Sequence, residues 1–158
     1  MNYKPGDKVI HTKYGLGDVV QMDDKFIQGR STHCYVVRTR EMTIWVPVDE
    51  ISNLRLRLPC SKSEFKELFG ILKSKSEALA EDRYDRKLQL LERMEGGNLA
   101  SICRVVRDLS SYRKINKMND NDKSTLEQAR NSLLEEWMYV FNLSLPHAQQ
   151  ELDLLLQI

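Results

Sequence analysis

The fold is decided within residues 54–69, LRLRLPCSKSEFKELF, where a strand pattern gives way to a helix pattern. Leu54 to Leu58 is the last of several short β-type segments, and Pro59 ends it. Ser61 and Glu64 then form a capping box, in which each side chain satisfies a free amide donor of the other residue at the start of a helix. The chain therefore divides at this point into a β part and a helical part.

Residues 1–58 have the pattern of a small β domain, because β-branched and aromatic residues gather in short segments between turns. The predicted strands include Val9-Ile10, Val19-Val20, Tyr35 to Val37, Thr43 to Val46 and Leu54 to Leu58. Five short strands in about fifty residues are too few for a sandwich of ordinary size, but they suffice for a small barrel of the SH3 or Tudor type.

Residues 61–158 have the pattern of a compact all-α bundle of about five helices, because apolar residues recur at helical spacing. The predicted apolar faces consist of Phe65, Leu68, Phe69 and Leu72; Tyr84, Leu88, Leu91 and Met94; Leu99, Ile102, Val106 and Leu109; Leu126, Ala129, Leu133, Trp137 and Val140 or Phe141; and Leu152, Leu155 and Leu156. Gly96-Gly97 ends the second helix, while Asn98 and Ser144 cap later ones. Ser110 to Asp122 is expected to contain a loop. The predicted fold class is therefore α+β.

Composition narrows the function classes. The 158 residues carry 24 basic and 23 acidic side chains, whereas a strongly basic nucleic-acid binder has a clear basic surplus. The sequence has neither the roughly 20 apolar residues of a membrane span nor the apolar run of a signal peptide. Three widely spaced cysteines indicate reduced thiols in a cytoplasmic protein. Since no motif for catalysis, a metal or a cofactor is present, we do not expect an enzyme. We also expect the protein to be a monomer.

Two features have both a structural and a functional interpretation. Trp45 is either a half-buried barrel residue or an exposed anchor for a protein partner, since Trp is enriched in interface hot spots. The segment from Arg104 to Lys117 holds five basic residues against Asp108 alone. Such a segment is either a solvated face or a surface that contacts DNA phosphates without reading sequence.

Six short segments carry a resemblance to a known family. They are Lys4 to Ile10, Tyr14 to Gly17, Trp45 to Val48, Gly97 to Leu99, Val105 to Leu109 and Leu126 to Arg130. In this order, over nearly the whole chain, they resemble the CarD/CdnL family of bacterial transcription regulators. The resemblance implies a Tudor-like domain that binds the β subunit of RNA polymerase, followed by a helical domain that reaches promoter DNA at the upstream edge of the transcription bubble. It also implies that the protein stabilises the open promoter complex without catalytic activity.

The resemblance assigns a polymerase-binding surface to the N-terminal domain. Lys25 matches a basic residue that contacts the β subunit, and Trp45 stands where the family has a second basic residue. The contact of Trp45 is therefore expected to be apolar or cation–π. The expected surface consists of Lys25, Ile27, Trp45 and Pro47.

The resemblance and the local charge assign DNA contacts to the helical domain. Arg86 and Lys123 match basic positions that face DNA, and Arg83 stands where the family places a Trp that enters the minor groove. Helical spacing puts Tyr84 in line with Leu88 and Leu91 against the bundle, so Arg83, about 100° away, is expected to point at DNA. The expected DNA-contacting residues are Arg83, Tyr84, Arg86, Arg104, Arg107 and Lys123.

Two other functions fit the same sequence. An adaptor would keep the polymerase contact without productive DNA contact, which the missing Trp and the balanced charge permit. A free-standing Tudor domain would instead bind a peptide through an aromatic cage of Tyr14, Tyr35 and Trp45.

Overall fold

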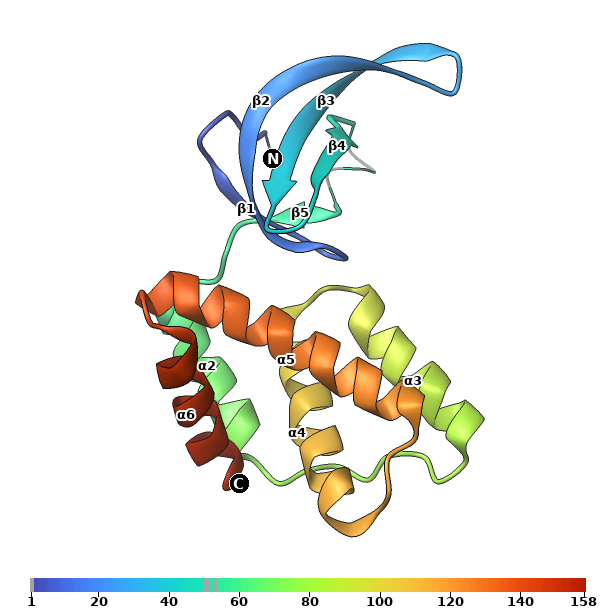
Figure 1. Ribbon diagram of the computed structural model, residues 1–158, viewed down its shortest axis with the longest axis vertical. Helices are drawn as coiled ribbons and strands as arrows, with labels where there is room; N and C mark the ends of the chain where they lie inside the picture. Colours follow the sequence, from blue (N-terminus) through green and yellow to red (C-terminus); the bar gives the residue numbers. More distant parts are fainter. Residues whose placement is uncertain (1, 50–51, 53) are drawn as a thin grey trace. The chain divides into compact units, whose positions relative to one another are not determined.

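The computed structural model describes residues 2–49, 52 and 54–158. Two compact units follow each other along the chain, Met1–Pro59 and Cys60–Ile158 (Figure 1). The first unit holds strands β1 to β5, and the second holds helices α2 to α6. The α+β class predicted from the sequence is therefore confirmed.

The described strands pair in one antiparallel sheet in the order β4-β3-β2-β1-β5. Their bounds are β1 Lys8–His11, β2 Gly15–Ile27, β3 Arg30–Thr39, β4 Thr43–Pro47 and β5 Leu56–Arg57. Each overlaps a strand predicted from the sequence. The sheet is strongly curved (Figure 1), and the described pairings do not join its edge strands β4 and β5. The described pairings therefore form a curved sheet. None of them closes it into the barrel that the sequence predicts.

β2 and β3 form one hairpin that is much longer than the sequence predicts. Ile27 pairs with Arg30, and the two residues between them, Gln28 and Gly29, have φ values of 50° and 79°. Positive φ at both central positions is the conformation of a type I′ turn, which matches the twist of the strands it joins. The turn therefore lets β2 and β3 continue together far beyond the rest of the sheet.

Two local features set the pairing of β2. Gly17 lies where the strands approach closely, because a Cβ at this position would be 2.9 Å from the carbonyl oxygen of Arg38. The register then shifts between Val19 and Gln21, which marks a β-bulge. Because one residue is inserted there, Asp23 and the odd-numbered residues after it point to the opposite face from Val19.

The core of the first unit lies on the inner face of the sheet. It contains Tyr3, Val9, Val19, Tyr35, Val37, Val46 and Leu56. Tyr3 is held in this core by two hydrogen bonds of 3.2 Å. Its hydroxyl donates to the carbonyl oxygen of Leu56, and its amide donates to the hydroxyl of Tyr35. The opposite, outer face also holds buried residues, Cys34 and Val36, and its exposed part lies toward the β2–β3 turn.

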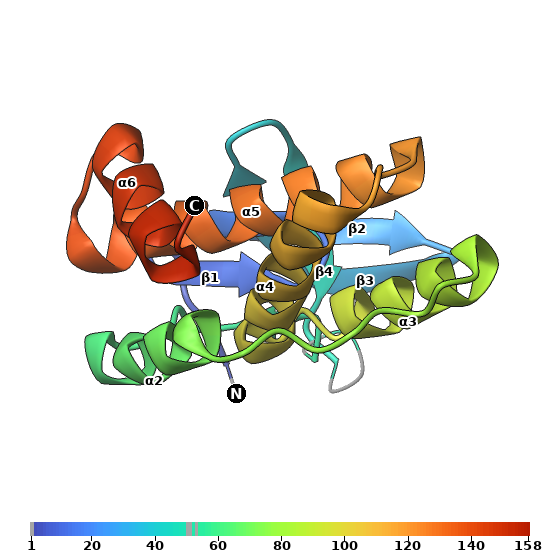
Figure 2. The same cartoon turned by 90° about the horizontal axis from the view of Figure 1, so that it is seen from below.

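The second unit is a compact bundle in which α4 runs through the middle and packs on α2, α3 and α5 (Figure 2). The helix bounds are α2 Lys62–Lys73, α3 Arg83–Glu95, α4 Leu99–Ile115, α5 Asp120–Phe141 and α6 Leu145–Leu156. The predicted capping box of Ser61 with Glu64 and the N-caps Asn98 and Ser144 are confirmed. The loop expected within Ser110 to Asp122 is confirmed, and it is short, because α4 continues to Ile115 and α5 begins at Asp120.

Aromatic packing anchors α5 in this bundle. Trp137 is 1% exposed, as its helical spacing predicts, and its ring centroid lies 4.8 Å from that of Phe69 and 6.0 Å from that of Phe65. Phe141 adds an edge contact to Phe65, with 5.5 Å between ring centroids. α2 and α5 are therefore held together by contacts among buried and half-buried rings.

Candidate functional site

The four residues assigned to a polymerase-binding surface share the outer face of the sheet. On β3, Cys34 pairs with Asp23 of β2 on one side and with Pro47 of β4 on the other. Side chains directly opposite each other point to the same face, and side chains alternate along each strand. The outer face therefore carries Lys25, Ile27, Trp45 and Pro47.

Lys25 and Trp45 are in direct contact on this face. Nζ of Lys25 lies 4.0 Å from the centroid of the Trp45 ring, and the indole Nε1 of Trp45 donates a 3.3 Å hydrogen bond to Oδ2 of Asp23. Lys25 is exposed and Trp45 is half-buried. The hydrogen bond orients the indole, and the cation–π contact restrains the lysine. The surface thus presents the Lys25 ammonium stacked on the Trp45 ring, and both groups belong to this chain.

The aromatic cage of a peptide-binding Tudor domain is not formed. Tyr35 is 1% exposed and belongs to the core on the inner face, whereas Trp45 lies on the outer face. The ring of Tyr14 packs on His11, with 4.9 Å between the centroids. Because the three rings do not converge, the interpretation of Tyr14, Tyr35 and Trp45 as a cage is wrong.

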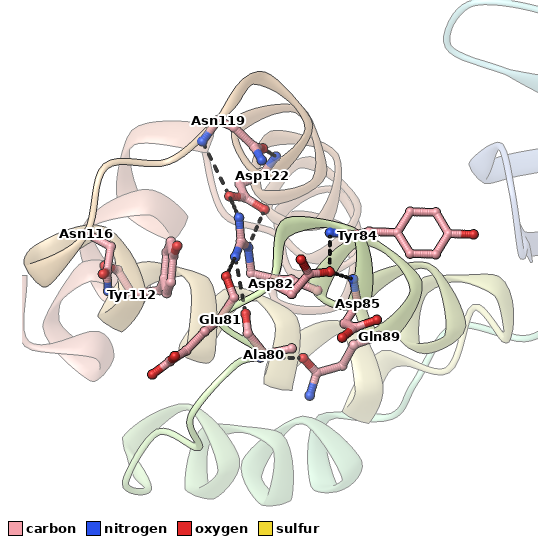
Figure 3. A network of polar contacts seen from close by, with 11 residues as sticks. Ala80, Glu81, Asp82, Tyr84, Asp85, Gln89, Tyr112, Asn116, Asn119 and Asp122 are labelled. Carbon is pink, nitrogen blue, oxygen red and sulfur yellow. Dashed lines mark hydrogen bonds and ion pairs between the residues drawn. The ribbon is translucent and has the colours of Figure 1, made fainter.

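A buried arginine organises one end of the helical unit (Figure 3). Nε and Nη2 of Arg86 each donate a 3.0 Å hydrogen bond to the carboxylate of Asp122. Nη1 donates to the carbonyl oxygens of Ala80 at 3.1 Å and Glu81 at 3.0 Å. The guanidinium carbon lies 4.9 Å from the centroid of the Tyr112 ring. The hydrogen bonds to Asp122 raise the pKa of Arg86 above its usual value, so the arginine stays charged.

The contacts of Arg86 tie three helix ends together. Ala80 and Glu81 precede α3, Tyr112 lies in the last turns of α4, and Asp122 lies in the first turn of α5. Oδ2 of Asp122 also accepts the amide of Asn119, which completes a capping box at the start of α5. Arg86 is only 4% exposed, so the expectation that it faces DNA is wrong.

Arg107 is also buried, at 7% exposed. Its Nε donates to Oδ1 of Asp108, and its Nη1 donates to the hydroxyl of Ser74, both at 2.8 Å. The same Asp108 accepts a 2.8 Å hydrogen bond from Nη1 of Arg93. Arg107 therefore links α4 to the end of α2, and the expectation that it is exposed for DNA is wrong. Arg104 is half-buried.

The other cations around the Arg86 network are exposed. Arg83 precedes Arg86 by one turn of α3, and Lys123 directly follows Asp122 in α5. The end of α4 and the loop after it add Arg113, Lys114 and Lys117, which belong to the basic segment from Arg104 to Lys117. We call this set the basic end; it consists of Arg83, Arg113, Lys114, Lys117 and Lys123.

Acidic residues at the helix starts moderate this charge. The side chain of Asp82 caps α3 by accepting hydrogen bonds from the amides of Tyr84 and Asp85, at 3.1 and 3.0 Å. Asp120 lies in the first turn of α5, where a negative charge favours the helix. The basic end is therefore a group of exposed cations whose net positive charge is reduced by neighbouring carboxylates.

α3 is turned the opposite way from the sequence prediction. Tyr84, Leu88 and Leu91 are 65%, 47% and 50% exposed, whereas Arg86 and Leu90 are the buried side chains of the helix. Met94, the fourth residue of the predicted face, does pack on the core. The ring of Tyr84 points away from the buried network (Figure 3). The expectation that Tyr84 packs on the bundle is wrong, because the hydrogen bonds of Arg86 place the polar residue inside.

Two family models match the two units. The model described as "CarD-like/TRCF RID domain" matches residues 3–57, and the model described as "CarD, C-terminal domain" matches residues 67–153. The chain belongs to the CarD family. The resemblance inferred from six sequence segments is thereby confirmed.

One curated relative of this CarD-family chain is named "Putative transcription factor YdeB" in Bacillus subtilis (strain 168). The two sequences are 23% identical over 137 residues, which cover 85% of this chain and 89% of the relative. The two matching domains and this relative indicate that the CarD-family chain is a transcription regulator. No helix in the part of the chain that the structure describes combines the length and apolarity that crossing a membrane requires.

Proposed function

We propose that this CarD-family chain binds the β subunit of RNA polymerase through the outer face of its sheet and contacts promoter DNA through its helical unit. The polymerase would place the helical unit at the upstream edge of the bubble, where it changes the stability of the open complex. The observation that carries the proposal is the direct contact of Lys25 with Trp45, which joins two family-assigned positions in one surface.

The outer face has the properties of a protein-contact surface. Trp45 is a half-buried aromatic anchor whose orientation is fixed by Asp23, and Lys25 adds a charge at its edge. A preoriented aromatic ring loses little conformational freedom on binding, and a rim charge assists association with an acidic partner surface. Ile27 and Pro47 extend the surface with half-buried apolar groups.

For the DNA contact we propose the basic end. Arg83 and Lys123 are the two family-assigned cations that are exposed there, and Arg113, Lys114 and Lys117 extend the same region along the chain. Exposed Lys and Arg bind phosphates without reading sequence. Arg104 is not included, because nine residues of α4, or about 14 Å of helix, separate it from Arg113.

The lifetime of the open promoter complex tests this proposal. Arg83→Ala with Lys123→Ala should shorten the lifetime that the intact protein gives, because two phosphate contacts are lost. Lys62→Ala with Lys66→Ala, which removes two exposed cations from α2, is the matched control and should leave the lifetime unchanged. An unchanged lifetime in the first variant, with polymerase binding intact, would contradict the proposed DNA contact.

The second candidate function is an adaptor that binds polymerase without productive DNA contact. The burial of Arg86 and Arg107 favours it, because two of the cations assigned to DNA are used inside the protein. Footprinting on a promoter complex separates the two functions. Protection of the upstream edge by the intact protein, lost in the Arg83 and Lys123 double variant, supports DNA contact, and no protection at all supports the adaptor.

A further inference from the structure

α3 carries an apolar stripe that the rest of the helical unit leaves uncovered. Tyr84, Leu88 and Leu91 are spaced at i, i+4 and i+7 and therefore lie on one side of the helix. Their exposed fractions are 65%, 47% and 50%. α2, in contrast, buries three apolar residues at similar spacing, as is usual for a helix on the surface of a globular unit.

Two ion pairs to buried carboxylates fix the rotation that exposes this apolar stripe. Arg86 pairs with Asp122, and seven residues later Arg93 donates a 2.8 Å hydrogen bond to Asp108. Both aspartates are 1% exposed. Turning α3 to bury the stripe would break these contacts of two buried carboxylates, at a large cost in free energy. The stripe is therefore a lasting feature of the surface.

The edges of the apolar stripe are mainly acidic. Asp85 and Glu92, seven residues apart, lie along one side, and Glu95 continues the line of the stripe at its C-terminal end. Lys87 and, one turn before it, Arg83 are the basic residues on the other side. All five are exposed, and three carboxylates against two cations leave a net negative charge that is concentrated on the side of Asp85 and Glu92.

We propose that the apolar stripe of α3 is a docking surface for a partner protein, and that the docked element is an amphipathic helix with Lys or Arg beside its apolar residues. Apolar anchors at i, i+4 and i+7 match the spacing by which helices recognise one another. The acidic edge favours a basic partner and disfavours an acidic one. The inference does not depend on the proposed polymerase or DNA contacts.

Charge also argues against two other occupants. The carboxylates of Asp85 and Glu92 repel DNA phosphates, so the side of the stripe that carries them disfavours DNA. In an antiparallel two-fold pair of α3 helices each edge faces its own copy, which would bring the edge with Asp85 and Glu92 against itself. A basic helix from a different protein avoids both conflicts.

Two synthetic helical peptides with the same leucine stripe test the charge preference. One carries lysines beside the leucines and the other carries glutamates, and each is titrated into the full-length chain while binding is followed by fluorescence anisotropy. The lysine peptide should bind more tightly. In the variant Asp85→Lys with Glu92→Lys the order of the two affinities should be reversed, which a non-specific apolar contact would not produce.

Substitutions in the stripe test its location. Leu88→Ser with Leu91→Ser should weaken binding of the lysine peptide by about tenfold or more, because two anchor side chains are removed. The matched control is Leu154→Ser, which removes a 71% exposed leucine from α6 and should not change binding. Thermal unfolding of these variants should stay close to that of the intact chain, because the replaced side chains are substantially exposed.

Several outcomes would overturn the proposal. They are no binding of the lysine peptide, equal binding of both peptides, and unchanged binding in the Leu88 and Leu91 double variant. Self-association of the intact chain that this double variant abolishes would assign the stripe to a second copy instead. A loss of DNA affinity in the same variant would assign the stripe to DNA. A failure of polymerase binding or of the open-complex effect would leave these peptide results unaffected.

Discussion

Arg86 and Asp122 form a two-point ion pair whose side chains are 4% and 2% exposed. Removing one partner of such a pair leaves the other charge buried without compensation. Arg86→Met should therefore lower the free energy of unfolding by about 3–5 kcal/mol, measured by denaturant titration. The double variant Arg86→Met with Asp122→Leu should lose less, because no unpaired charge remains.

The control for the ion pair is Arg83→Met, one turn earlier in α3 and exposed. Its free energy of unfolding should stay within about 0.5 kcal/mol of the intact chain. Equal effects of Arg83→Met and Arg86→Met on the free energy of unfolding would show that the ion pair of Arg86 does not stabilise the fold.

The outer face of the sheet gives a second prediction. Lys25→Glu should weaken binding to the polymerase β subunit while leaving thermal unfolding unchanged, because an exposed charge acts on association rather than on packing. Trp45→Ala should weaken binding further, since it removes the aromatic anchor. Arg40→Glu, in the turn between β3 and β4, is a charge-reversal control that should bind normally. Normal binding by Lys25→Glu, combined with unfolding of Trp45→Ala, would remove this surface from consideration.

His11 predicts a dependence of stability on pH. Burial, with the nearby charges of Arg55 and Lys13, lowers the pKa of His11 below its ordinary value of 6.5. Its Nδ1 accepts the amides of Lys13 and Tyr14 at 3.1 and 3.2 Å, which only an unprotonated nitrogen can do. Below about pH 6.5 the unfolded chain binds a proton that the folded chain resists, so acidification should lower the free energy of unfolding.

The variant His11→Asn isolates this effect, because an Asn oxygen can accept the same two amides without titrating. Its free energy of unfolding should fall less between pH 7 and about pH 5 than that of the intact chain. His147→Gln, at an exposed position of α6, should keep the full pH dependence. An identical pH dependence in His11→Asn and the intact chain would contradict the assignment to His11.

Affinity for free DNA should be low. The chain has a net charge of +1, and the basic end is moderated by acidic residues at the helix starts. We expect a dissociation constant for bare duplex of about 10⁻⁴ to 10⁻⁶ M or weaker, which rises steeply with salt. Submicromolar, sequence-specific binding to promoter DNA at physiological salt would contradict the view that polymerase supplies the localisation.

Arg83 tests the family wedge position. A guanidinium is attracted to a narrow minor groove but does not separate stacked bases, whereas an apolar ring does. Arg83→Trp should therefore lengthen the open-complex lifetime relative to the intact chain, and Arg83→Ala should shorten it modestly. A lifetime unchanged by Arg83→Trp would show that Arg83 lies away from the bubble edge.

Features that depend on neighbouring residues could be predicted from the sequence. The capping box at Ser61, the N-cap at Asn98 and the burial of Trp137 each follow from a local pattern, and the structure confirms them. The pattern Asn119-x-x-Asp122 would also have located the start of α5, because it is a capping box of the same kind.

Features that depend on distant partners could not be predicted. Arg86 lies 36 residues before Asp122, and nothing near it in the sequence marks a buried arginine. The pair with Asp122 sets the rotation of α3 and thereby exposes Tyr84. The prediction that Tyr84 packs on the bundle was wrong for this reason. The burial of Arg107 depends in part on a distant residue too, since Ser74 lies 33 residues away, although its other partner, Asp108, is the next residue in the chain. On the outer face, the family resemblance named Lys25 and Trp45, but only the register of β2, β3 and β4 brings them together.

The pairing of β1 with β5 has a consequence for how the first unit folds. β2 and β3 are joined by a two-residue turn and can pair within microseconds, whereas Ile10 must find Arg57 across most of the unit. During synthesis β1 can pair with β2 early, but its other edge stays unpaired until Arg57 has left the ribosome. That edge is open to other chains for the interval.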